Sequence, residues 1–118
     1  MAGPLVFKEL LSGRFDPEQI RWQPFRPGVE IARLYGGAPD VASAALLRYE
    51  PNAEVPQHIH HGFEHIIVLS GSQRDDKGSV FEAGSLVISA PGSSHAISSE
   101  TGCVVLAIWE RPVEILET

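Results

Sequence analysis

The sequence predicts a single all-β domain, a sandwich or barrel built from short strands. Eleven glycines and nine prolines divide the 118-residue chain into short segments, and most of these segments are rich in strand-forming residues. Clusters of turn-forming residues separate the segments, for example at 36–40, 75–78 and 91–94. This regular alternation of strand and turn is typical of all-β folds rather than of helical domains.

The expected elements follow in chain order. Helix is expected only near the N-terminus, where Phe7, Leu10 and Leu11 have helical spacing and Asp16-Pro17-Glu18 resembles a helix cap. Residues 22–27 are expected to extend along the barrel. Strands are expected at residues 29–35, 42–49, 65–70, 79–83, 86–90, 103–110 and 113–116. We therefore treat residues 1–118 as one domain, with an N-terminal arm at 1–27 and a β-barrel at 28–118.

Composition and charge exclude several classes of function. The chain is 43% hydrophobic and 20% charged, which is typical of a globular protein. A formal net charge of −6 argues against a nucleic-acid partner, because binding nucleic acid requires clustered positive charge. No apolar run is long enough to span a membrane and no secretory signal is visible. With Cys103 as the single cysteine, an intrachain disulfide is excluded and a cytoplasmic location is expected.

Four of the five histidines lie close together, at His58, His60, His61 and His65. Side chains two positions apart on a strand share a face, so His58 and His60 point the same way. If the strand resumes after the following glycine, Glu64 keeps that parity. Two imidazoles and a carboxylate then converge on one interior point, which is a ligand set for a divalent metal. The alternative is a histidine-rich loop that is merely solvated.

His95 follows the Pro91-Gly92 turn and supplies a third imidazole from a neighbouring hairpin. Three nitrogens and one carboxylate leave a position open for water or a ligand, as in a catalytic or sensing site. His61 and His65 have the opposite parity and are expected on the surface or in packing. His65 is nevertheless kept as a candidate catalytic residue.

Two further residues each have two interpretations. Arg48 lies between Leu47 and Tyr49, and it is either an anion anchor facing the barrel, hence a candidate catalytic residue, or a side chain facing solvent or another subunit. Cys103 opens an apolar strand, where a lone cysteine usually acts as a small hydrophobe. A thiol near a metal would instead respond to oxidants.

The pattern His58-x-His60-x3-Glu64-x6-Gly71 matches the first motif of the cupin superfamily. The second cupin motif is matched, with the expected spacing, by Gly84, Gly92 and His95. Two departures are visible. The usual proline stands one position late, at Pro91, and Ser99 stands where asparagine is common.

More narrowly, the chain resembles the ChrR-type cupins from about Trp22 to Leu116. The resemblance is carried by Trp22-x-Pro24, Arg26-Pro27-Gly28-Val29, Leu47-Arg48, Val68-Leu69-Ser70-Gly71-Ser72, Asp75-Asp76-x-Gly78, Ala83-Gly84, Pro91-Gly92-Ser93-Ser94-His95, Ser99-Glu100-x-Gly102-Cys103 and Trp109-Glu110-x-Pro112-Val113. It implies an RmlC-like jelly-roll barrel, or double-stranded β-helix, with a metal bound inside by His58, His60, Glu64 and His95. Zinc is the first expectation for that metal, and iron, manganese and nickel are the alternatives. Where the family often has a second acid after the ligand glutamate, this chain has His65.

Zinc-binding ChrR-type cupins form the C-terminal domain of some anti-sigma factors, which also carry a helical N-terminal domain that grips the sigma factor. Only about twenty residues precede Trp22 here, so no direct sigma-factor binding is expected.

Three functions remain. The first is a metalloenzyme that acts on a small organic molecule, in the manner of a dioxygenase or isomerase. The second is a non-catalytic sensor or binding module that responds to oxidants or to a small ligand. The third is a structural barrel with a vestigial site, which we rank last because all four ligand types are intact. A homodimer is expected, since open sheet edges are commonly covered by self-association.

Overall fold

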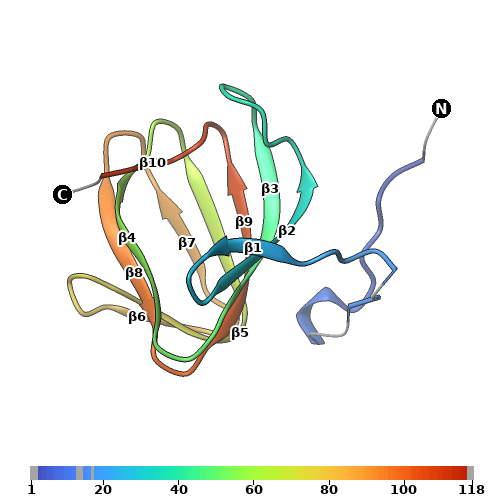
Figure 1. Cartoon of the computed structure of the whole chain (residues 1–118), viewed down its shortest axis with the longest axis horizontal. Coiled ribbons are helices and arrows are strands. Elements are labelled where there is room, and N and C mark those ends of the chain that lie inside the picture. The colour runs from blue at the N-terminus through green and yellow to red at the C-terminus, as the bar shows by residue number, and fades with distance from the viewer. Residues whose placement is uncertain (1–2, 13–14, 17, 117–118) are drawn as a thin grey trace.

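The computed structural model describes residues 3–12, 15–16 and 18–116, and it folds them into two antiparallel sheets that curl around a common interior (Figure 1). A single turn of 3₁₀ helix, η1, spans Leu10–Ser12. The strands are β1 (Gln23–Arg26), β2 (Val29–Tyr35), β3 (Ser43–Tyr49), β4 (Ala53–Ile59), β5 (Glu64–Asp75), β6 (Val80–Glu82), β7 (Leu86–Ser89), β8 (Ser94–Ser99), β9 (Cys103–Trp109) and β10 (Glu114–Ile115). The all-β prediction is confirmed.

Strand β5 belongs to both sheets. Its first half pairs with β9 and β7, in a sheet of order β1-β2-β3-β9-β5-β7. Its second half pairs with β6 and β8, in a sheet of order β10-β4-β8-β5-β6. All these pairings are antiparallel, and the long strand that passes from one sheet to the other closes a jelly-roll barrel. The jelly-roll prediction is therefore confirmed.

The barrel interior forms the main core. Strand β9 alternates buried and half-buried residues along its length, and its inward side chains include Val105 and Ala107, both fully buried. Val68 of β5 is fully buried beside them. This period-2 burial is what a strand with one face on a core requires. The interior faces of both sheets thereby surround one apolar space, and the candidate site lies within it.

A second apolar layer lies outside the first sheet. Leu46 of β3 and Leu69 of β5 face outward and are buried against the N-terminal segment, which contributes Ile20 and Trp22. In Figure 1 this segment runs beside β1, β2 and β3, away from the C-terminus. Because both faces of β3 are covered, nearly every residue of that strand is buried.

Three strands lie outside the expected strand ranges. Gln23–Arg26, in the expected arm, pairs with β2 as β1. Strands β4 and β8 pair with each other although both are rich in polar residues. The expected N-terminal helix is reduced to η1, and the cap predicted around Pro17 falls partly outside the described residues. In the described part of the chain, no helix is long and apolar enough to cross a membrane.

Candidate metal centre

Three imidazoles converge inside the barrel. His58 lies near the end of β4 and His60 directly follows that strand, while His95 on β8 is the register partner of His58. The ring centroids are 5.2 Å apart for His58 and His60, 4.6 Å for His58 and His95, and 4.7 Å for His60 and His95. One ring nitrogen from each lies within 4.8 Å of the other two, which is close enough for one ion to contact all three.

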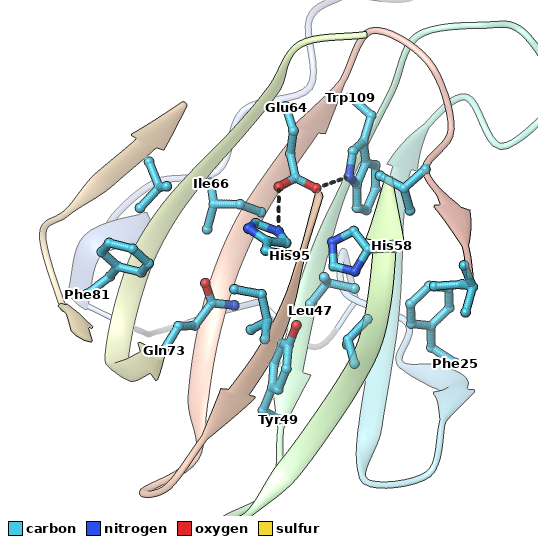
Figure 2. Close-up of a pocket in the computed structure, with 15 residues that line it drawn as sticks. Phe25, Leu47, Tyr49, His58, Glu64, Ile66, Gln73, Phe81, His95 and Trp109 are labelled. Carbon is cyan, nitrogen blue, oxygen red and sulfur yellow. Dashed lines mark hydrogen bonds and ion pairs between the residues drawn. The ribbon is translucent and has the colours of Figure 1, made fainter. Parts of the chain in front are cut away.

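The carboxylate of Glu64 lies beside this triad, at the start of β5 (Figure 2). Its Oε1 lies 3.2 Å from His60 Nε2 and 3.9 Å from His95 Nε2. Its Oε2 accepts a hydrogen bond of 2.7 Å from the indole Nε1 of Trp109. Trp109 therefore fixes the carboxylate so that the other oxygen faces the histidines.

Backbone carbonyls orient two of the rings. The Nδ1 of His58 donates to the carbonyl oxygen of Pro56 at 2.8 Å, and the Nδ1 of His60 donates to that of Ser93 at 3.0 Å. A carbonyl can only accept, so both Nδ1 atoms carry hydrogen and both Nε2 atoms face the centre. This is the usual way in which proteins fix the tautomer of a metal-binding histidine. Pro56 lies in a β-bulge of β4, between the paired residues Val55 and His58.

Electrostatics keep three of the four donors, His58, His95 and Glu64, in their metal-binding forms. Burial lowers the pKa of His58, and burial together with the neighbouring His58 lowers the pKa of His95 to about 4, so both rings are neutral near pH 7. Burial alone would raise the pKa of Glu64, but hydrogen bonds from His60 and Trp109 outweigh it and the pKa is lowered. Burial also opposes protonation of His60, but Glu64 outweighs it and raises the pKa of that imidazole.

The residues fit a divalent metal. His95 Nε2 is a buried side-chain nitrogen with no hydrogen-bond partner in the described part of the chain, and it points at the other two rings. A lone pair left unpaired in this way is costly unless a ligand takes it up. Neutral imidazoles and one ionised carboxylate suit zinc, iron, manganese and nickel alike, so the donor set does not select among them. A divalent ion would take the place of the proton between His60 and Glu64.

A cavity of about 50 Å³ adjoins the centre (Figure 2). His58, Glu64 and His95 form its polar wall. Tyr49 and Gln73 line the side of the cavity away from Glu64 (Figure 2). The remaining lining is apolar, from Phe25, Leu47, Val55, Ile66, Phe81, Val87, Ile97, Trp109, Val113 and Ile115. A metal in this position would therefore face a mostly dry chamber.

The candidate catalytic residues Arg48 and His65 lie outside this chamber. Arg48 is exposed on the outer face of β3, where it pairs with Glu30 at 2.6 Å and stacks over the Trp22 ring, 4.2 Å from its centroid. It therefore helps to hold the N-terminal arm. His65 faces outward on β5 because its neighbours Glu64 and Ile66 face inward. Their catalytic roles stay predictions.

His61 and Cys103 also lie apart from the centre. The exposed His61 bonds Glu114 of β10 through Nε2 at 2.8 Å. Cys103 lies at the opposite end of β9 from Trp109, and burial raises the pKa of its thiol to about 11. A thiol protonated in this way is a poor target for oxidants.

Three further residues line the cavity. From the sequence, Trp109 and Tyr49 have two interpretations, packing or the lining of a pocket mouth, and Gln73 carries no signal. The only signal for Trp109 lies in the β5–β9 register, which sets it opposite Glu64. That register is a property of the folded sheet and cannot be predicted from the local sequence pattern.

Changing Trp109 to phenylalanine is expected to lower metal affinity about tenfold while the ring packing is kept, because Glu64 Oε2 loses the hydrogen bond that the indole donates. The affinity is measured by competition with a chromophoric chelator. Trp22→Phe, in the arm, is the matched control and is expected to have no effect. Equal affinity in the two variants would show that the indole does not position Glu64.

Comparisons with known proteins agree with this geometry. A family model described as the ChrR cupin-like domain matches residues 12–112. The anti-sigma-E factor ChrR of Cereibacter sphaeroides is 35% identical over 98 residues, which cover 81% of this chain and 45% of that protein. The chain therefore spans about half the length of this curated relative.

Solved structures show the same fold. The complex of Rhodobacter sphaeroides SigE with the anti-sigma ChrR matches with a TM-score of 0.67 at 33% identity, covering 80% of this chain and 50% of that chain. An acetylacetone dioxygenase from Acinetobacter johnsonii matches with a TM-score of 0.78 at 15% identity, covering 99% of this chain and 80% of that chain. At that identity the second match shows the fold alone.

One prediction from the sequence is wrong. Direct sigma-factor binding was excluded, yet a relative of this domain is an anti-sigma factor that was solved in complex with SigE. The exclusion rested on the short segment before Trp22. That length does not test whether the barrel surface itself can contact a partner.

Proposed function

The chain belongs to the ChrR cupin-like domain family, and from this premise we propose that it holds one divalent metal through His58, His60, His95 and Glu64 and acts on a small molecule in the adjoining chamber. The observation that carries the proposal is the convergence of three imidazoles, two of them buried, beside a mostly apolar cavity whose wall includes His58 and His95. A purely structural metal site would have no need of a chamber beside it.

A divalent metal with four protein ligands would supply Lewis-acid chemistry to an oxygen of the substrate, and a redox-active metal would add dioxygen chemistry. The chain's own residues perform the other tasks. Trp109 holds Glu64 in its ionised form, since it donates to the carboxylate. Apolar walls exclude water and so strengthen every charge interaction in the chamber. These features support an enzyme of the dioxygenase or isomerase type.

The first experiment is elemental analysis of tag-free protein purified without added metal or chelator. Near-stoichiometric iron, manganese or nickel would support the redox or isomerase enzyme, and screening by oxygen uptake would follow. Zinc is the expected metal and would favour hydrolytic or sensing chemistry over dioxygen chemistry. Protein that holds no metal and takes none up on addition would contradict the proposal.

The second candidate is a metal-dependent sensing module that works with a protein partner. The 35% identity to an anti-sigma factor favours it, and a sigma factor is then the class of partner to test first. Because the chain covers only 45% of that relative, this partner is a proposal rather than a finding. A pull-down of candidate sigma factors by metal-loaded and metal-free protein distinguishes the two candidates.

Cys103→Ser is expected to leave metal content unchanged and to change oxidant sensitivity by less than about twofold. The thiol is buried, has a raised pKa, and lies at the far end of β9 from Trp109 and Glu64. Metal content after graded peroxide treatment is the measurement, with the untreated variant as control. Loss of metal from the untreated variant would instead make the thiol part of the site.

A further inference from the structure

The three imidazoles of the metal centre are not held alike. Backbone carbonyls fix the Nδ1 atoms of His58 and His60, whereas within the described part of the chain no hydrogen bond fixes the Nδ1 of His95. The His95 side chain is also 15% exposed, against 1% for His60 and 7% for Glu64. His95 is therefore the proposed ligand that is least tightly held and most open to solvent.

A groove of about 220 Å³ lies on the outer side of His95. Polar residues form most of its wall, and they include Asp76 and Lys77 of the turn between β5 and β6. His95 lines both this groove and the inner chamber, which none of the other three proposed ligands does. Its ring therefore lies between the metal centre and the groove.

The fold places the carboxylate of Asp76 close to this ring. Its Oδ1 accepts a hydrogen bond of 3.2 Å from the backbone N–H of Ala96, the residue after His95. This bond lowers the pKa of Asp76, so the carboxylate is ionised near pH 7. The neighbouring Asp75 is occupied differently, because its Oδ1 accepts from two backbone N–H groups of the turn. Asp76 therefore presents a negative charge to a cation in the groove.

A second approach to the chamber is unfavourable for a cation. Phe25, Trp109 and Val113 line both the chamber and a second cavity, of about 160 Å³. Arg33 lies on the wall of this second cavity. A divalent cation that came this way would pass a guanidinium and then apolar side chains, and burying a cation without ligands is costly.

We propose that the groove outside β8 is the route by which the divalent metal reaches and leaves the centre, with Asp76 attracting the cation and the unanchored ring of His95 as the ligand that it passes. The inference rests on the proposed function, because the metal centre is the end of the route. Asp76 acts on the passage of the ion and is not one of its final ligands. It therefore changes the rates of uptake and release together and leaves the affinity nearly unchanged.

The kinetics of zinc exchange test this route. The Kd is measured by chelator competition. The rate of release is measured by mixing zinc-loaded protein with enough chromophoric chelator that the rate no longer depends on its concentration. The rate constant for uptake is then the release rate divided by Kd. Asp76→Asn is expected to slow release and uptake alike by about three- to tenfold, with Kd unchanged within about twofold.

Glu100→Gln is the matched control for Asp76→Asn. It removes the same charge from an exposed residue just beyond the other end of β8, roughly 16 Å along the chain from His95. That distance exceeds the Debye length of about 8 Å at physiological ionic strength. We expect both rates of zinc exchange to stay unchanged in this variant.

A second pair of variants distinguishes the two approaches. Lys77→Gln removes a positive charge from the groove, so it is expected to speed uptake and release about two- to threefold. Arg33→Gln removes the same charge from the second cavity and is expected to change neither rate.

The outcomes separate the route from the metal centre itself. Release that is unchanged or faster in Asp76→Asn overturns the inference, since faster release is the result if the carboxylate only stabilises the bound ion. A larger effect of Arg33→Gln than of Lys77→Gln places the route at the second cavity and overturns the inference equally. Both results leave the metal centre standing. Protein that takes up no zinc overturns the proposed function and this inference with it.

Discussion

Replacement of His60 by alanine is expected to lower the affinity for a divalent metal by at least about tenfold. His60 is 1% exposed, its Nδ1 is fixed by Ser93, and its Nε2 lies among the other donors. No neighbouring side chain can replace a ligand that is held so firmly. Metal affinity measured by chelator competition, and metal content after dialysis, are the two readouts.

The same variant is expected to lose most of the stabilisation that metal gives. A ligand that binds only the folded state raises the free energy of unfolding in proportion to the logarithm of its concentration divided by its Kd, once the ligand is well above Kd. Each tenfold loss of affinity therefore removes about 1.4 kcal/mol. His60→Ala also removes one of the partners of the buried Glu64, which destabilises the metal-free protein. The informative quantity is therefore the difference in Tm between metal-loaded and metal-free protein, measured for each variant.

His61→Ala is the matched control, because it removes an exposed imidazole next in sequence whose Nε2 bonds the exposed Glu114, away from the metal centre. It is expected to keep both metal affinity and the Tm difference. A His60→Ala protein that behaved like His61→Ala would refute the assignment of the centre.

The sequence predicted the converging residues because strand parity is local. His58 and His60 are two apart, and Glu64 resumes the same parity after the glycine turn, so their common direction follows from chain geometry alone. What joins His95 to them is the β4–β8 pairing, a contact between distant segments. The place of His95 after the Pro91-Gly92 turn indicated a third imidazole from a neighbouring hairpin, and the match to the second cupin motif supported it.

Strands β4 and β8 lay outside the expected strand ranges for a related reason. Their sequences, AEVPQHI and SHAISS, are poor in the residues that favour strands. They are held by pairing with each other and by the barrel around them. The same polar composition lowers their strand propensity and includes the histidines on their inner faces, His58 of β4 and His95 of β8.

The direction of Arg48 shows a second limit. Alternation from the buried Leu47 and Tyr49 would direct Arg48 outward, but Leu46, two positions earlier and on the same face of β3 as Arg48, is also buried. A strand covered on both faces has no clear period, and the cover here is the N-terminal arm. The local sequence therefore left the direction of the Arg48 side chain open, because the N-terminal arm that covers the outer face of β3 is distant in sequence.

Gly71 ends the first cupin motif, and the structure gives a physical reason for glycine at this point. It adopts a left-handed φ of 71° where β5 passes from one sheet to the other, just after a bulge between Val68 and Ser70. Its register partner is Cys103, and a side chain at this position would overlap the backbone oxygen of Gly102. Both the conformation and the close approach exclude a Cβ.

Gly71→Ala is therefore expected to lower the free energy of unfolding by about 2–4 kcal/mol, the sum of a left-handed alanine and an overlap with backbone. Gly78→Ala is the matched control, since Gly78 also has a left-handed φ, of 88°, but has nothing within 4 Å of its added Cβ. Its expected cost is only about 1–2 kcal/mol. Denaturant unfolding of metal-free protein measures both.

Equal losses in the two variants would show that φ alone matters at Gly71 and that the contact with Gly102 relaxes freely. Metal affinity of the folded Gly71→Ala protein is expected to change by less than about threefold, because Glu64 begins β5 while Gly71 lies beyond its bulge. If this holds, the motif combines two separable tasks. Its histidines and glutamate bind the metal, and its glycine lets one strand serve both sheets that enclose the centre.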